Sequence, residues 1–242
     1  MIRALALCLA LAPAGALADC RQALALGLDV SGSVDSQDYR LQLEGLAGAL
    51  QDPTVRSALL SQPDSHVEVF VYTWSGPDHQ RIVLDWTEIT APAALDQAAQ
   101  QLRQTQRIKS DPSTAIGAAM AFGAAALHSR VACPLKVLDI SGDGPANTGP
   151  LPQNMRNQGL LGGIIVNGLV IPSLDPVEGD RRTGGALALD DYYRAYVIHG
   201  PGAFTEMALG YQDYQDAMTR KLIRELQGLV LSHARDLRPV LQ

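Results

Sequence analysis

The stretch Leu24-Ala25-Leu26-Gly27-Leu28-Asp29-Val30-Ser31-Gly32-Ser33 decides the predicted fold. Its apolar start is typical of a strand that is covered on both faces of a sheet. A carboxylate and two hydroxyls follow, at Asp29, Ser31 and Ser33. Open α/β sheets bind ligands at the carboxyl ends of their strands, and these side chains offer the oxygen atoms that Mg²⁺ prefers. For this stretch alone a second interpretation stays open, in which a serine caps the next helix and Asp29 accepts hydrogen bonds from loop amides.

Apolar runs with strand character alternate with helical periodicity along the rest of the chain. The expected further strands are 67–74, 81–84, 134–140, 164–171 and 192–199. The expected helices are 36–50, 92–104, 113–128, 151–161 and 211–231, and the polar, glycine-rich residues 172–185 are expected to form a surface loop. The strand at 81–84 follows too short a turn for a crossover, so it is expected to be antiparallel. This pattern predicts a doubly wound α/β fold, with a mainly parallel six-stranded sheet, one antiparallel edge strand and helices on both faces.

The N-terminal residues 1–18 have the features of a secretory signal peptide. One basic residue, Arg3, precedes a short apolar run that ends in Ala16-Leu17-Ala18. This run is too short to span a bilayer, and no later segment is predicted to span one. We expect cleavage after Ala18, a single domain at 19–242, and a periplasmic or secreted location. Lipidation of Cys20 is disfavoured, because lipoproteins generally carry a small residue before the modified cysteine, and this chain has Asp19 there.

The charge pattern argues against two classes of partner. The chain carries 25 acidic and 19 basic residues, a formal net charge of −6, and it has no basic cluster. Nucleic acid and anionic membranes are therefore poor partner candidates. The sequence also contains no G-x-S-x-G elbow and no Walker-type phosphate loop.

Two cysteines, Cys20 and Cys133, lie outside the expected signal peptide. Each comes just before an expected strand. If these strands are parallel neighbours, both sulfurs lie at the same edge of the sheet. A disulfide is the natural hypothesis for an even pair in an oxidising compartment. The alternative is a pair of separate buried thiols.

Three polar clusters fall at the opposite, carboxyl edge of the predicted sheet. The first is the cluster Asp29, Ser31 and Ser33; the second is Thr114, at the start of a helix rich in small residues; the third is Asp143, after the strand at 134–140. Together they supply two carboxylates and three hydroxyls, which suffice for an octahedral Mg²⁺ when water fills the remaining positions. A helix cap at Thr114 and an Asx-turn at Asp143 are the alternatives.

The segments D-V-S-G-S, T-A-I-G and S-G-D-G, in this order, resemble the metal-ion-dependent adhesion site of von Willebrand factor type A domains. The resemblance covers nearly all of 19–242. The segments W-S-G, after the second strand, and G-P-G-A-F, at 200–204, resemble those of an exported bacterial subgroup of proteins that carry this domain alone. The resemblance implies that Ser31 and Ser33 coordinate the metal directly, and that Asp29, Thr114 and Asp143 do so directly or through water. It further implies Mg²⁺, with Mn²⁺ or Ca²⁺ as alternatives, and a protein partner whose acidic side chain completes the site.

Two further residues are candidates for the rim of this site. Trp74 ends the second strand and is a candidate ligand-facing anchor, with core packing as the alternative. Asp111 lies in a loop where relatives often carry glycines, and there it would alter the charge around the metal.

We expect a binding module without catalytic residues. The main rival is a metal-dependent phosphohydrolase, because an aspartate at a strand end with a later aspartate also suits phosphoryl transfer. Phosphatases of the haloacid-dehalogenase type need a second aspartate two residues after the first, and this chain has Ser31 there. A third candidate is a degenerate domain that serves only as a scaffold.

Overall fold

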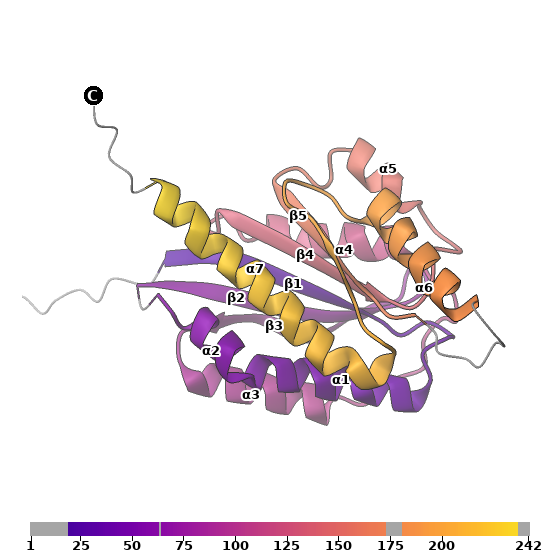
Figure 1. The fold of residues 1–242 in the computed structure, drawn as a ribbon, viewed down its shortest axis with the longest axis horizontal. Coiled ribbons are helices and arrows are strands. Elements are labelled where there is room, and N and C mark those ends of the chain that lie inside the picture. The colour runs from indigo at the N-terminus through magenta and orange to yellow at the C-terminus, as the bar shows by residue number, and fades with distance from the viewer. Residues whose placement is uncertain (1–18, 63, 173–180, 237–242) are drawn as a thin grey trace, which may run out of the picture.

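The computed structural model describes residues 19–62, 64–172 and 181–236. Its sheet has the strand order β3-β2-β1-β4-β5-β6, and helices cover both faces (Figure 1). The strands are β1 (Asp19–Asp29), β2 (Ser65–Trp74), β3 (Gln80–Ile89), β4 (Leu135–Gly142), β5 (Ile164–Val170) and β6 (Thr205–Met207). All neighbouring strands are parallel except β2 and β3. The predicted fold class is therefore confirmed, with β3 as the antiparallel edge strand.

The helices divide between two apolar layers. The α-helices are α1 (Ser36–Gln51), α2 (Pro53–Leu59), α3 (Pro92–Gln104), α4 (Ile116–His128), α5 (Pro152–Asn157), α6 (Arg181–Tyr192) and α7 (Tyr214–Asp236). A π-helix, η1 (Tyr193–Val197), continues α6, and a 3₁₀ turn, η2 (Tyr211–Asp213), precedes α7. Buried residues of α1, α2, α3 and α7 form one apolar cluster with the sheet, and those of α4, α5, α6 and η1 form the other. Among the described residues, no helix is long and apolar enough to cross a membrane.

Strand β1 carries large side chains on one face and small ones on the other. Its leucines belong to the cluster of α1 and α7, whereas Ala23 and Ala25 belong to the cluster of α4. Helix α4 is itself rich in alanine and glycine, so it lies close to the sheet. The Tyr72 hydroxyl crosses this layer and donates a 2.8 Å hydrogen bond to the Ala119 carbonyl. A Cβ at Gly27 would lie 2.6 Å from that hydroxyl, so this position requires glycine.

Helix α1 ends at Gln51, one residue after the predicted end, but the chain after it is not the irregular connection that the sequence predicts. Pro53 instead begins the short helix α2, as proline often does at a first helical position. Asp52 caps this helix, because its Oδ1 accepts hydrogen bonds from the amides of Thr54 and Val55 at 2.8 and 3.1 Å. The prediction missed a local cap.

The predicted final strand at 192–199 is wrong. This segment contains η1, and the last strand is β6. Tyr193 and Val197 are four residues apart and both are buried, which is a helical spacing. His199 makes only an isolated antiparallel bridge to Val166. The tyrosine and valine content of this segment suggested a strand, and the spacing of its buried residues decided against one.

Several other boundaries differ from the prediction. Residues 173–180 of the expected loop lie outside the described residues, and the loop prediction is wrong for 181–185, which are helical. Two glycines there lower intrinsic helix propensity, but packing of the following Leu189 against the core overrides it. Strand β3 is longer than 81–84, and α5 is shorter than 151–161 because Gly159 adopts a φ of +71° soon after it.

Candidate metal site

Parallel pairing brings the ends of β1 and β4 to one edge of the sheet, called here the carboxyl edge. Leu28 of β1 lies opposite Ser141 of β4. Asp29 is the last residue of β1, and Asp143 follows the last residue of β4. The two carboxylates that the sequence singled out therefore lie at neighbouring strand ends.

The turn after β1 forms a continuous polar network with Asp143. Asp29 Oδ1 accepts a 2.8 Å hydrogen bond from the amide of Ser31. The hydroxyl oxygens of Ser31 and Ser33 lie 3.3 Å apart, and Ser33 donates a 2.6 Å hydrogen bond to Asp143 Oδ1. Ser31 is buried and Ser33 is exposed, so the network runs from the core to the protein surface.

The loop that carries Thr114 packs against this turn. The amide of Gly32 donates to the Pro112 carbonyl at 2.9 Å. The amide of Thr114 donates to Asn147 Oδ1 at 2.8 Å, which fixes Thr114 beside the loop that follows β4. Helix α4 begins after Thr114, with Ala115 as its N-cap and no side-chain cap hydrogen bond. Thr114 is thus not the cap of α4, and the helix-cap alternative fails.

No cationic side chain of the described residues pairs with either carboxylate. Asp29 is fully buried, and its Oδ2 has no hydrogen-bond partner among the described residues. Burial, followed by the nearby charge of Asp143, raises the pKa of Asp29 from 3.8 to about 7. Burial also raises the pKa of Asp143. Within the described ranges, neither carboxylate forms an ion pair.

The set of donors fits a hard divalent cation. A buried carboxylate oxygen without a partner is costly unless an opposite charge or a donor reaches it. The neighbouring hydroxyls of Ser31 and Ser33 add oxygen atoms, and Thr114 brings a third hydroxyl on the loop that packs against this turn. No nitrogen or sulfur ligand belongs to this group. Oxygen donors of this kind suit Mg²⁺ or Ca²⁺.

Sequence reasoning missed residues that support the site from behind. Tyr211 of η2 donates a 3.2 Å hydrogen bond to Asp143 Oδ2. Gln42 of α1 donates a 2.9 Å hydrogen bond to the backbone carbonyl of Asp29. Both residues come from segments distant in the sequence, and neither has a local signal. Tyr211 lies at the expected start of the last helix, but only its position in the fold shows the contact.

A tyrosine also lies beneath the carboxylates. A Cβ at Gly142 would lie 2.5 Å from the Tyr193 hydroxyl and 3.1 Å from Asp29 Oδ2, so the glycine leaves room for both groups. The Tyr193 hydroxyl is buried and makes no hydrogen bond within the described part of the chain. Burial, with a further contribution from Asp29, raises the pKa of Tyr193 far above its usual value.

The two rim candidates have different outcomes. Trp74 is fully buried in the apolar cluster of α4, so the expectation that it faces a ligand is wrong in this structure. The reason is that its ring lies on the same face of β2 as Phe70 and Tyr72. Asp111 is half-buried, and its Oδ1 accepts hydrogen bonds from the amide and hydroxyl of Ser113 at 2.8 and 2.5 Å. These bonds lower the pKa of Asp111 and organise the loop before Thr114.

The structure joins Cys20 and Cys133 in a disulfide at the opposite edge, called here the amino edge. Cys20 belongs to the start of β1, and Cys133 precedes β4. The two Cα atoms lie 4.8 Å apart, across 113 residues of sequence.

A family model described as "Protein of unknown function (DUF1194)" matches residues 19–230. No curated protein sequence matches the chain.

Solved structures share this fold at low sequence identity. A von Willebrand factor type A protein from Catenulispora acidiphila is 12% identical, with a TM-score of 0.55 over 86% of this chain and 43% of its own. Proximal thread matrix protein 1 from the mussel byssus, solved with a zinc-occupied MIDAS (metal-ion-dependent adhesion site) motif, is 11% identical, with a TM-score of 0.56 over 86% and 48%. The conserved hypothetical protein BatB from Bacteroides thetaiotaomicron is 16% identical, with a TM-score of 0.54 over 85% and 98%. The chain thus spans less than half the length of the first two.

Proposed function

This chain belongs to the DUF1194 family and has a von Willebrand factor type A fold, and from this premise we propose that it is a protein-binding module that depends on a divalent metal. The observation that carries the proposal is the buried Oδ2 of Asp29, which has no partner in the described residues and lies beside a second carboxylate. A divalent cation at this position would offset both charges.

The proposed ligands are the five residues that the sequence singled out. Ser31, Ser33 and Thr114 would contribute hydroxyl oxygens, and Asp29 and Asp143 would contribute carboxylates directly or through water. Mg²⁺ is the proposed cation, with Mn²⁺ and Ca²⁺ as alternatives, because all five donors are oxygens. The existing contacts of Ser33 with Ser31 and Asp143 support this set, since they already hold three of the five residues together.

The proposed partner is a protein that presents an acidic side chain. The two carboxylates balance the formal charge of a dication. Because three of the five donors are neutral hydroxyls, the metal would still attract a further carboxylate. Ser33 is exposed, which supports access from the surface at this point. The bound partner would therefore supply the remaining oxygen ligand.

A capture experiment tests this proposal. Immobilised wild-type protein is exposed to a periplasmic extract with Mg²⁺ or with a chelator. We expect a defined partner to be retained only with Mg²⁺, and to be lost in the Asp29→Ala, Ser31→Ala double variant. The matched control is Asp78→Ala, because Asp78 is an exposed acidic residue outside the proposed ligand set. Equal retention with the chelator, or by the double variant, would refute metal-dependent binding.

We further propose that the module is not an enzyme. Residue 31 is a serine, which cannot serve as the acid or base that phosphatases of the haloacid-dehalogenase type place there. Turnover of generic phosphate esters that requires added Mg²⁺ and is lost in Asp29→Ala would overturn this part of the proposal.

Export is the proposed route to the partner. Residues 1–18 lie outside the described residues, and their sequence supports a cleaved signal peptide. N-terminal sequencing of the exported protein is expected to begin at Asp19. A protein that keeps Met1 and remains in the cytoplasm would contradict this expectation.

A further inference from the structure

Four metal-ligating side chains gather at the amino edge of the sheet. Cys20 and Cys133 form the disulfide there, and His66 and Glu68 come from β2. Cys20 lies opposite His66 in the parallel pairing of β1 with β2. All four residues are buried, with exposed fractions of at most 8%. This cluster shares no residue with the candidate metal site at the carboxyl edge.

The donor atoms have the spacing of a tetrahedral zinc site. Zinc bonds to nitrogen, oxygen and sulfur are about 2.0–2.3 Å long, which places neighbouring donors roughly 3.3–3.8 Å apart. Glu68 Oε1 lies 3.6 Å from Sγ of Cys133 and 3.7 Å from Nε2 of His66. Ligand atoms of Cys20, His66 and Glu68 all lie within 4.8 Å of one another. Once the S–S bond is broken, the two sulfurs can separate to this spacing, and a small adjustment of His66 and Glu68 would bring all four donors to one ion.

His66 has no hydrogen-bond partner among the described residues in the disulfide form. Both of its ring nitrogens are buried, and neither makes a hydrogen bond to any described residue. Buried polar groups are nearly always satisfied, so this imidazole points to a missing ligand.

Glu68, by contrast, is already oriented by a neighbour. Arg130 Nη1 lies 3.1 Å from Glu68 Oε2, and the Arg130 guanidinium stacks 5.4 Å from the centre of the Trp86 ring. The other oxygen of Glu68, Oε1, is the one that faces Cys133 and His66. An outer partner that holds one oxygen while the other faces the ion is typical of metal sites.

We propose that the chain with reduced cysteines binds one Zn²⁺ through Cys20, His66, Glu68 and Cys133. The disulfide and the zinc ion are then alternative ways of fastening the start of β1 to the segment before β4. Thiolate and imidazole ligands favour zinc over Mg²⁺, so this site selects a different ion from the oxygen site at the carboxyl edge.

Reduction and zinc binding convert the disulfide form into the zinc form. A dithiol reductant attacks the disulfide, the S–S bond breaks, and two electrons and two protons pass to the two cysteine sulfurs while the reductant becomes a disulfide. Zinc binding then releases the two thiol protons, because the ligands are thiolates. In the reverse direction, oxidised glutathione takes two electrons from the thiolates and two protons from water, two glutathione thiols form, and the zinc ion leaves.

Co²⁺ is the probe for this site, because thiolate ligation gives an intense charge-transfer absorption that oxygen ligands do not give. The full protein is reduced with dithiothreitol, freed of reductant without air, and titrated with Co²⁺. We expect one equivalent of thiolate-bound Co²⁺ in the reduced protein and none in the disulfide form. Zn²⁺ is expected to displace the Co²⁺, and oxidised glutathione is expected to abolish the absorption.

Single variants separate the ligands from the rest of the fold. His66→Ala and Glu68→Gln are each expected to weaken Co²⁺ binding at least about tenfold, and Glu68→Gln keeps the shape of the side chain. His128→Ala, at an exposed histidine, is the control and is expected to bind as the wild type does. Absence of the thiolate absorption in the reduced protein, or equal affinity in wild type and both ligand variants, overturns the proposal. If circular dichroism shows that reduction unfolds the chain, recovery of the fold on adding Zn²⁺ supports the proposal and failure to recover overturns it.

Discussion

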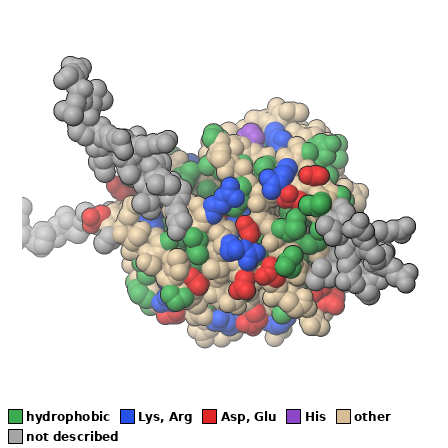
Figure 2. Space-filling model, in the orientation of Figure 1, with side chains coloured by type: hydrophobic (Ala, Val, Ile, Leu, Met, Phe, Trp, Pro, Cys, Tyr) green, Lys and Arg blue, Asp and Glu red, His purple; other side chains and the backbone are tan. Residues whose placement is uncertain are grey.

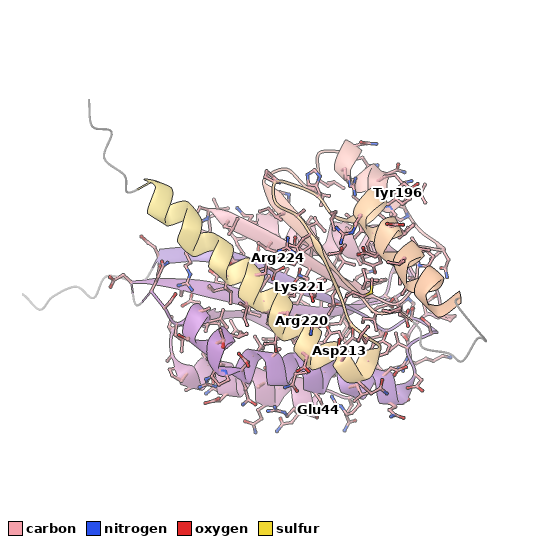
Figure 3. All side chains as sticks on the ribbon, in the orientation of Figure 1. Glu44, Tyr196, Asp213, Arg220, Lys221 and Arg224 are labelled. Atoms are coloured by element: carbon pink, nitrogen blue, oxygen red, sulfur yellow. A yellow bond between two sulfur atoms is a disulfide. The ribbon has the colours of Figure 1, made fainter. Side chains whose placement is uncertain are left out.

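Two pairs of carboxylates lie close to β4, and among the described residues only one pair has a cationic partner. Asp139 of β4 and Glu225 of α7 share Lys221, whose Nζ contacts Asp139 Oδ1 and lies 2.5 Å from Glu225 Oε1. Lys221 is fully buried in the middle of α7, where this helix crosses the sheet (Figure 3). Asp29 and Asp143 have no such lysine or arginine partner within the described residues.

The difference separates a structural cluster from a binding site. The chain supplies its own cation where the charges fasten α7 to the sheet, and Asn167 of β5 adds a 2.7 Å hydrogen bond to Glu225. At the carboxyl edge no lysine or arginine of the described residues pairs with Asp29 or Asp143, and an external cation would offset the cost of burying their charges. The surface around α7 shows both acidic and basic side chains (Figure 2).

The largest effect is expected from Lys221→Met. This change leaves Asp139 and Glu225 as uncompensated buried charges, and the expected loss is about 3–5 kcal/mol of unfolding free energy in urea denaturation. Lys109→Met, at an exposed lysine, is the control and should change stability by less than about 0.5 kcal/mol. A loss from Lys221→Met no larger than that of the control would mean that the cluster does not hold α7 in place.

The pair at the carboxyl edge is expected to give metal-free stability a pH dependence. The folded protein retains a proton on Asp29 between its ordinary pKa of 3.8 and its raised pKa of about 7, whereas the unfolded chain has released it. Stability in a chelator should therefore fall as pH rises from about 4 to 7, by on the order of 4 kcal/mol from this group.

Urea denaturation of wild type and Asp29→Asn at each pH isolates the contribution of Asp29. Asp29→Asn should lose most of this slope, because asparagine has no proton to release. Identical slopes in the two proteins would show that Asp29 is not held in a desolvated, unpaired state.

A smaller effect is expected from Tyr211→Phe. Loss of the hydrogen bond to Asp143 Oδ2 should cost about 1 kcal/mol of stability. Metal affinity should fall by a few fold, because Asp143 loses the contact that orients it. Tyr196→Phe is the control, since Tyr196 is an exposed tyrosine of η1 with no hydrogen bond to Asp143 among the described residues. Metal titration of both variants measures the affinity. Equal metal affinities of Tyr211→Phe and Tyr196→Phe would show that Tyr211 does not help to orient Asp143.

The sequence predicted the parts of the fold that depend on local pattern. The succession of strands β1 to β5 along the chain follows from apolar runs, and the carboxyl edge follows from parallel pairing. Strand β6 was missed because it has only three residues, and η1 was misread because tyrosine and valine favour strands in isolation. Trp74 at a strand end gave no indication of which face of β2 it occupies.

Only the proposed metal ligands of the candidate site could be predicted from the sequence. Asp29, Ser31 and Ser33 form a local pattern, and Asp143 and Thr114 fall at the same edge once the strands are ordered. Support from Gln42, Tyr193 and Tyr211 comes from long-range packing, which has no short-range signal. The cluster at the amino edge shows the same limit, because His66 and Glu68 are remote in sequence from both cysteines.

Calorimetric titration with Mg²⁺ at pH 8 tests most directly the claim that the carboxyl edge binds a divalent metal. This pH lies above the raised pKa of about 7 of Asp29, so that this carboxylate is mostly ionised and a proton competes little with the metal for it. We predict that the wild type binds one Mg²⁺ per chain and that Asp29→Asn binds at least about tenfold more weakly. No binding by the wild type, or equal affinity in the two proteins, would contradict the account.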